Sequence, residues 1–281
     1  MNAPDAGSAR APYVRRAVMR ASSDHDAEEN TWGIAVEAPV EIALNDTPWT
    51  VMLATPSDLE DLAVGLALTE GVLRVATAVQ QVTISEFLHD VSVNIVAPES
   101  SLDLTAIRSR SLLSSTACGL CGLESLAQLR ERFVNRTTRD ARVVITDDAI
   151  RSAFSALPDH QPLNRATRSV HAAAWCGPSG AIDLVREDVG RHNALDKLIG
   201  ALARRHSLDA PGFIVMSSRC SYELVYKARV ANTQLLATIS APTTMALEWS
   251  DALSLPLVCC SGGLDVVHFP AEPRTELPDA R

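Results

Sequence analysis

Apolar and polar positions alternate in several short stretches of the first third of the chain, a pattern typical of half-buried strands. Residues 40–44 and 49–53 alternate in this way, and the Asn-Asp-Thr-Pro segment at 45–48 between them has the residues of a tight turn. This combination predicts a β-hairpin. Residues 79–84 and 91–96 predict two further strands.

A helical period follows the first hairpin. Four apolar side chains recur at the spacing of one helix face: Leu59, Leu62, Ala63 and Leu66. This spacing predicts an amphipathic helix. Ser57 and Glu60 have the spacing of a capping box at its start, and Gly71 is a suitable end.

The second half of the chain alternates strand and helix patterns. A hairpin is expected around the Gly-Pro-Ser-Gly turn at 177–180. Helices and strands then follow in turn, at 195–202, 213–216, 224–228, 235–239, from 242, and at 255–259. Such alternation implies right-handed crossovers and a largely parallel sheet. The expected fold class is α/β (α+β overall), with an α/β C-terminal part and a smaller N-terminal α+β part.

The division of the chain follows from these patterns. The first residues are rich in Ala, Pro, Ser, Asp and Arg and lack a period, which predicts disorder. The expected segments are a disordered tail at 1–30, a small α+β part at 31–115, a cysteine-pair loop with a following helix at 116–145, the α/β part at 146–270, and a tail at 271–281.

Charge and cysteine content exclude several classes of protein. The 281 residues include 25 Lys and Arg against 34 Asp and Glu, a formal charge of −9. A nucleic-acid coat or an anionic-membrane binder would need clustered cations. Six unevenly spaced cysteines are too few for a disulfide scaffold and indicate reduced thiols. With no apolar signal segment or membrane-spanning run in the sequence, we expect a cytoplasmic protein.

The segment at 117–122, Ala-Cys-Gly-Leu-Cys-Gly, holds two thiols three positions apart, Cys118 and Cys121. A helix starting after them would lower a thiol pKa and favour the nucleophilic thiolate. Three functions fit: a nucleophilic or persulfide-carrying pair, half of a zinc site, or a thioredoxin-like dithiol. Zinc would need two further ligands, and the sequence has no second cysteine pair with ligand spacing. A thioredoxin-like pair would follow the first strand of a βαβ unit.

The segment at 186–197, Arg-Glu-Asp-Val-Gly-Arg-His-Asn-Ala-Leu-Asp-Lys, gathers charged side chains at the start of a predicted helix. A solvated helix start with Asn193 as N-cap would explain part of this pattern. Arg191, His192 and Lys197 lie near the positive end of the helix dipole, where an anionic ligand or neighbouring carboxylates would explain cations.

Three loops of small residues follow successive predicted strands, at 217–221, 240–244 and 259–263. Each loop alone has the composition of an ordinary serine or threonine cap. At adjacent strand ends they would line one crevice suited to a phosphate or a pterin.

Three segments together resemble the FdhD/NarQ family, the formate dehydrogenase accessory sulfurtransferases: 117–122, 186–200, and Ser218-Arg219 with Glu223 and Lys227. The similarity covers roughly residues 35 to 270. It implies a cytidine-deaminase-like fold for the α/β part and a homodimer. It also implies an enzyme that moves sulfane sulfur from a cysteine desulfurase, through a cysteine persulfide, to the molybdenum bis(molybdopterin guanine dinucleotide) cofactor of formate dehydrogenase.

The resemblance assigns roles to individual residues. Cys118 carries the persulfide and Cys121 assists. The cofactor is a bound substrate, with no metal ligated by the protein, and its expected contacts are Arg191, His192, Ser218, Arg219, Lys227, Cys260, Ser261, Gly262, Gly263, Leu264 and Asp265. Segments 167–169 and 259–265 depart from the family pattern, and Arg168 is a candidate substitute for a missing cation.

Two alternatives accompany this function. A cofactor-binding chaperone would hold and insert the cofactor without covalent sulfur transfer. A zinc deaminase would need H-x-E upstream of P-C-x-x-C. Ala173 stands where that Glu would be, and the cysteine pair lies upstream, so deamination is not expected.

Overall fold

The N-terminal part of the computed structural model contains a four-stranded sheet, and the structure describes residues 10–22, 25–88, 90–103, 143–261 and 265–271. The strand order is β4-β3-β6-β5. The elements are β3 (Ala38–Leu44), β4 (Thr47–Ala54), α1 (Leu59–Thr69), β5 (Gln81–Glu86) and β6 (Val91–Val96). Apolar residues of α1 pack on the sheet in one buried cluster. The predicted hairpin, helix and two further strands are confirmed.

Local backbone geometry explains the boundaries of these elements. Asn45 and Asp46 both have positive φ, 48° and 62°, as the tight turn of a hairpin requires. Gly71, with φ 72°, follows the end of α1 as expected. The predicted capping box is wrong, because Asp58 is the N-cap of α1 and makes no side-chain cap bond. Its carboxylate lies 3.4 Å from the Arg186 guanidinium instead.

The C-terminal part is built on a six-stranded sheet with the order β12-β11-β10-β9-β7-β8. Its strands are β7 (His171–Cys176), β8 (Ile182–Asp188), β9 (Phe213–Cys220), β10 (Leu236–Pro242), β11 (Leu257–Ser261) and β12 (Asp265–Phe269). The α/β class is confirmed, but the expected largely parallel sheet is wrong. Only β9, β10 and β11 are parallel, because hairpins β7–β8 and β11–β12 reverse the chain on both sides of them.

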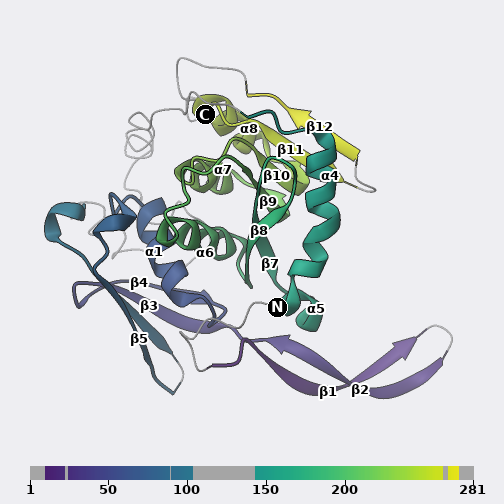
Figure 1. The fold of residues 1–281 in the computed structure, drawn as a ribbon. Coiled ribbons are helices and arrows are strands. Elements are labelled where there is room, and N and C mark those ends of the chain that lie inside the picture. Colours follow the sequence, from purple (N-terminus) through teal and green to yellow (C-terminus); the bar gives the residue numbers. More distant parts are fainter. Residues whose placement is uncertain (1–9, 23–24, 89, 104–142, 262–264, 272–281) are drawn as a thin grey trace.

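Helices cover both faces of this sheet (Figure 1). One face carries α6 (Arg191–Arg204), α7 (Tyr222–Val230) and α8 (Thr244–Leu253), and the other carries α4 (Asp147–Ala156) with α5 (Pro162–Thr167) at its end. Short 3-10 turns are η1 (Ala76–Ala78), η2 (Glu99–Ser101) and η3 (Leu157–His160). Within the described ranges, no helix is long and apolar enough to cross a membrane.

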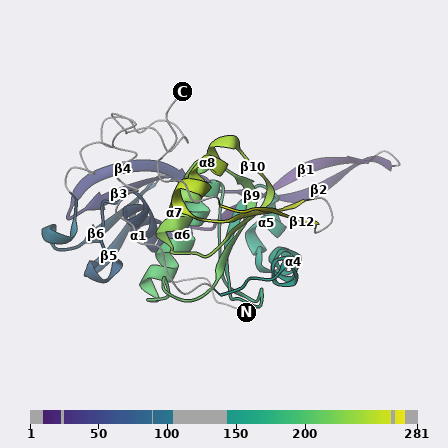
Figure 2. The ribbon, with the colours of Figure 1, turned by 90° about the horizontal axis from the view of Figure 1, so that it is seen from above.

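A two-stranded antiparallel ribbon, β1 (Tyr13–Ser22) and β2 (His25–Ala35), projects from the rest of the molecule (Figures 1 and 2). The predicted disordered tail is therefore wrong over these strands. At the base of the ribbon the Trp32 indole Nε1 donates to the Thr167 carbonyl at 3.3 Å, and the Arg168 guanidinium lies 5.8 Å from the Trp32 ring. A ribbon without a core of its own depends on such contacts, and no period in the sequence marks it.

Helices α1 and α6 join the two parts of the molecule through a close backbone crossing. A Cβ atom on Gly65 would lie 1.8 Å from the Asp196 carbonyl oxygen, and one on Gly200 would lie 1.9 Å from the Asp61 carbonyl oxygen. Only glycine fits at either position, because no real Cβ contact is that short. The N-terminal sheet is thus held directly against the helix that starts at the 186–197 segment.

Candidate functional site

Strand direction brings the predicted site segments to one edge of the large sheet. The carboxyl ends of parallel strands β9, β10 and β11 share this edge. Strand β7 runs antiparallel to β9, and His171 at its start pairs with Asp188 at the end of β8. The start of α6 and the segments after β9 and β10 therefore lie together, as the loop pattern predicts. The predicted loops are wrong in part, because residues 217–220, 240–242 and 259–261 continue β9, β10 and β11 as strand.

His171 is half-buried at this edge and lies near Arg191 and His192. Burial and then the charges of Arg191 and His192 lower its pKa below the ordinary value, partly opposed by a hydrogen bond with the Ser217 backbone and by the Asp188 carboxylate. The imidazole is therefore held neutral at pH 7. A bound anion would reverse part of this effect by offsetting the charge of Arg191.

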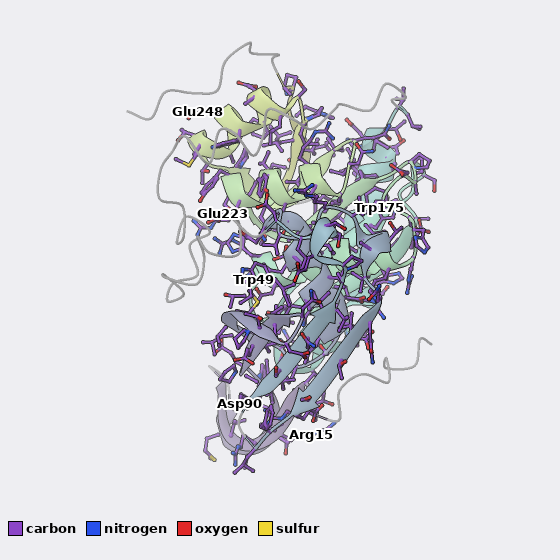
Figure 3. All side chains as sticks on the ribbon, turned by 90° about the vertical axis from the view of Figure 1, so that its left-hand side faces the viewer. Arg15, Trp49, Asp90, Trp175, Glu223 and Glu248 are labelled. Atoms are coloured by element: carbon purple, nitrogen blue, oxygen red, sulfur yellow. The ribbon has the colours of Figure 1, made fainter. Side chains whose placement is uncertain are left out.

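His192 is oriented by a carboxylate from α7. Its Nε2 lies 2.7 Å from Glu223 Oε2 and 3.4 Å from Ser221 Oγ, and the Ser221 hydroxyl donates to Glu223 at 3.2 Å. Glu223 is buried, and Figure 3 shows it on α7 above the N-terminal part that carries Trp49. One ring nitrogen of His192 thus has a fixed partner.

Arg191 and Arg219, at this edge of the sheet, differ from the other arginines and lysines near the site. Arg186 and Arg204 pair with Asp61, Lys197 pairs with Asp188, and Lys227 pairs with Asp196. By contrast, Arg191 and Arg219 make no ion pair or side-chain hydrogen bond with any other described residue. Arg219 is exposed, and Arg191 is partly exposed at the first residue of α6. Guanidinium groups in this state fit an anionic ligand such as a diphosphate.

Most other charges of the 186–197 segment turn inward. Glu187 accepts from the backbone N–H groups of Leu163 and Asn164, at 2.9 and 2.8 Å, at the start of α5. Burial raises the Glu187 pKa, and these two hydrogen bonds oppose the rise. Asn193 is not the N-cap of α6, a position taken by Gly190.

The Thr55 cluster consists of Thr55, Asp188, Asn193 and Lys197, all buried. The Lys197 Nζ lies 2.7 Å from Asp188 Oδ2 and donates to the Thr55 carbonyl at 2.9 Å. Asp188 also accepts from the backbone N–H groups of Thr55, at 3.0 Å, and Gly190, at 2.8 Å. This cluster links the end of β4 to the turn that precedes α6.

The Thr69 cluster consists of Thr69, Glu70, Asp196 and Lys227 and lies between α1, α6 and α7. The Lys227 Nζ lies 2.8 Å from Asp196 Oδ2 and 3.4 Å from Glu70 Oε1, and it donates to Thr69 Oγ1 at 2.9 Å. The Thr69 hydroxyl donates to Asp196 at 2.7 Å. Lys227 was expected among the cofactor contacts, but its ammonium group is buried in this cluster, so we leave it out of the candidate site.

The remaining expected contacts lie in different surroundings. Ser218 is buried, and its hydroxyl donates to the Arg219 carbonyl at 3.1 Å. Cys260 belongs to the core on the α4 face, where burial raises its thiol pKa. Ser261 ends β11, and exposed Asp265 begins β12. Gly262, Gly263 and Leu264 lie outside the described residues. Arg168 contacts Trp32 at the ribbon base, which gives it a role away from this edge.

Sequence reasoning missed the partners that hold this edge together. Thr55, Asp61 and Thr69 all come from the N-terminal part, more than 120 positions from the groups they bind. Residues so far apart in the sequence leave no local pattern that would predict their contact. The family resemblance covers these residues within 35 to 270, but it did not indicate which groups they bind.

Cysteine chemistry in the described part of the chain is unfavourable for sulfur transfer. Cys176, Cys220, Cys259 and Cys260 are all buried. Burial, with a smaller effect of Asp183, raises the pKa of Cys176 to about 12, and burial, with Cys259 nearby, raises that of Cys220 to about 12. Such thiols stay protonated and are poor nucleophiles. Cys118 and Cys121 lie outside the described residues.

Comparison with known proteins identifies the family of the chain. The model of the FdhD/NarQ family matches residues 35–272. The chain belongs to the FdhD/NarQ family. A relative from Xanthomonas euvesicatoria pv. vesicatoria (strain 85-10), named sulfur carrier protein FdhD, is 40% identical over 99% of this chain and 97% of its own length. The protein of the same name from Cupriavidus necator is 42% identical over 80% of this chain and 77% of its own length.

A solved structure shares the fold of this FdhD/NarQ chain. It is a crystal structure from Desulfotalea psychrophila of a protein described as a formate dehydrogenase accessory protein. The two structures align with a TM-score of 0.71 at 19% identity, over 93% of this chain and 98% of the other. This likeness supports the fold, and the family assignment rests on the sequence comparisons.

Proposed function

We propose that the chain is a sulfur carrier for formate dehydrogenase maturation. The observation that carries this proposal is the family match over residues 35–272, together with relatives at 40% identity that are named sulfur carrier proteins. The six cysteines support it by elimination, because the four in the described part are buried. Cys118 and Cys121 are then the candidates for carrying sulfur.

The proposed transfer has two steps, and a third step reduces the cysteine pair again. The Cys118 thiolate attacks the outer sulfur of a persulfide on a cysteine desulfurase, whose S–S bond breaks as its thiolate leaves. Cys118 now carries the sulfane sulfur as a persulfide. The Cys121 thiolate then attacks the inner sulfur, forming a Cys118–Cys121 disulfide and releasing hydrosulfide to the acceptor. A dithiol reductant of the thioredoxin class returns the pair to two thiols.

The acceptor in this proposal is the molybdenum bis(molybdopterin guanine dinucleotide) cofactor, bound as substrate. Its diphosphate groups would bind Arg191 and Arg219, beside the rings of His171 and His192. This assignment rests on the absence of other partners for the two guanidinium groups within the described ranges. We further propose that the protein is a cytoplasmic homodimer, which light scattering in solution would test.

A sulfur-labelling experiment tests the carrier function. Incubation with an active cysteine desulfurase and cysteine should add one sulfur atom to the peptide containing Cys118 and Cys121, as seen by mass spectrometry. Cys118→Ala should abolish the adduct, and Cys176→Ala, which changes a buried thiol, should not. A peptide that stays unmodified while the desulfurase turns over would contradict the proposal.

A cofactor chaperone without covalent transfer is the second candidate, and the two arginines without described partners favour it. The two functions separate on Cys118→Ala. A sulfur carrier loses formate dehydrogenase activation with this substitution but keeps cofactor binding. A chaperone keeps both.

A further inference from the structure

The turn from Asp188 to Gly190 sets where Arg191 and His192 lie. It joins β8 to α6, and the two side chains that follow it are the first two residues of that helix. Gly190 is the N-cap and makes no side-chain cap bond. The turn must therefore be fixed by bonds other than a side-chain cap at Gly190.

Two backbone N–H groups of this turn have partners in the Thr55 cluster. The Gly190 N–H donates to Asp188 Oδ1 at 2.8 Å, and the Val189 N–H donates to Thr55 Oγ1 at 3.1 Å. Thr55 also uses its own backbone, because its N–H donates to Asp188 and its carbonyl accepts from Lys197. The Thr55 side chain, N–H and carbonyl thus all bind the turn or the ion pair beneath it.

Asn193 closes the cluster from the α6 side. Its amide Nδ2 donates to Asp188 Oδ1 at 3.1 Å and to the Leu53 carbonyl at 2.8 Å. The first turn of α6 is thereby bound both to its own N-terminal turn and to the end of β4. Thr55, Asp188 and Lys197 are each 0% exposed, so water does not compete for these bonds.

We propose that Thr55, Asp188 and Lys197 are positioning residues, which hold Arg191 and His192 beside His171 for a diphosphate ligand. The inference rests on the anion site of the proposed function. It goes further by assigning a role to a residue of the N-terminal part that touches no ligand. A buried ion pair adds little net stability compared with apolar packing. The Lys197–Asp188 pair is therefore better explained by its effect on the turn than by its effect on stability.

Two buried threonines provide a matched experiment. Thr55→Val keeps the shape of the side chain and removes the acceptor for the Val189 N–H. Thr69→Val makes the same change at another 0% exposed threonine, in the Thr69 cluster. The structural cost of a buried hydroxyl is present in both variants, but only Thr55 contacts the turn. Thr55→Ser restores the hydroxyl and serves as the rescue.

The first readout is the titration of His171, followed by NMR and assigned with His171→Gln. The groups that act on this ring are Arg191, His192, Asp188 and the Ser217 backbone. In Thr55→Val, a displaced turn moves Arg191 and His192 away from the ring, so the pKa of His171 should rise toward 6.5. Thr69→Val and Thr55→Ser should titrate as the wild type does.

The second readout is binding of inorganic pyrophosphate, measured by calorimetry. Thr55→Val should bind at least about tenfold more weakly, because small misplacements of binding groups are costly. Thr69→Val should bind as the wild type does. If wild-type protein binds no pyrophosphate, the proposed anion site is wrong, whereas the titration still tests positioning by itself.

The outcomes decide the proposal as follows. A folded Thr55→Val protein whose His171 titrates as in Thr69→Val overturns it. If Thr55→Val does not fold, Asn193→Ala opens the same cluster from α6 and should produce the same rise in the His171 pKa. An unchanged His171 titration in that variant overturns the proposal equally.

Discussion

The Thr55 and Thr69 clusters have nearly the same composition, a lysine, an aspartate and a threonine buried against α6, but they hold different things. Most bonds of the Thr55 cluster go to backbone groups of an irregular segment. Those of the Thr69 cluster join side chains of helices whose backbones already pair internally. The first arrangement fixes a turn beside the candidate site, and the second fixes how helices pack.

The largest expected effect is loss of one lysine from either cluster. Lys197→Met and Lys227→Met should each lower the free energy of unfolding by about 3–5 kcal/mol, because each leaves a buried carboxylate without its cation. Urea unfolding measures both. Arg151→Met, which removes an exposed pair with Asp147 and Asp148, is the control and should change little. A loss under about 1 kcal/mol in either lysine variant would mean that its aspartate is already neutral.

The next effect comes from the crossing that lies between the clusters. Gly65→Ala should cost about 3 kcal/mol or more, since its Cβ would meet the Asp196 carbonyl and α1 must move away from α6. Both clusters should loosen together, seen as faster amide exchange at Val189 and at Asp196. Gly177→Ala is the control, because its Cβ would lie 3.5 Å from the Asp183 side chain, an ordinary contact. Exchange that increases at one cluster alone would show that the clusters are independent.

The sequence predicted elements where their pattern was local. The alternation at 40–53 and the period at 59–66 reflect burial by neighbouring residues, and both predictions are confirmed. The ribbon β1–β2 was missed because α5 supports it, more than 130 positions away. The prediction of a largely parallel sheet was wrong, because similar apolar stretches can be followed either by a hairpin, which gives antiparallel strands, or by a crossover, which gives parallel strands.

The candidate site was predicted only in part for the same reason. The 186–197 segment is dense in charge, but the sequence does not say which charges find partners. Thr55 and Asp61 in the N-terminal part decide that Lys197 and Arg186 turn inward. Arg191, from the same segment, is left without a partner in the described part of the chain. Contacts between residues so far apart in the sequence follow no fixed spacing, so the sequence pattern does not predict them.

A smaller effect is the pH dependence of stability, which differs between a group beside the Thr55 cluster and a group in the Thr69 cluster. The pKa of His171, beside the Thr55 cluster, is lowered, so the stability it contributes is present above 6.5 and is lost as pH falls through its folded-state pKa. The pKa of Asp196 is raised, chiefly by burial, so its contribution is present below 3.8 and is lost as pH rises. His171→Gln should therefore flatten the acid limb below pH 6.5, by less than about 1 kcal/mol because the ring is partly exposed.

Urea unfolding from pH 7 to pH 5 checks this prediction. His160→Gln, at an exposed histidine, is the control and should leave the acid limb unchanged. If wild-type protein and His171→Gln lose stability in parallel over this range, then burial and the neighbouring Arg191 and His192 do not lower the pKa of His171 in the way that the structure indicates.

A small effect of similar size is expected at the ribbon, where no buried charge is involved. Trp32→Phe keeps an aromatic ring for Arg168 but removes the Nε1 donor to the Thr167 carbonyl. The loss should be about 0.5–1.5 kcal/mol, as for one neutral hydrogen bond, and should appear as faster amide exchange in β1 and β2 with unchanged exchange in both clusters. Because the Trp32 indole bonds to α5 and to no residue of either cluster, any shift in the His171 titration of this variant would contradict the separation of the ribbon from the candidate site. Gly33→Ala provides the stronger form of the test, since its Cβ would lie 2.4 Å from the Ala166 carbonyl oxygen and would push the ribbon off α5.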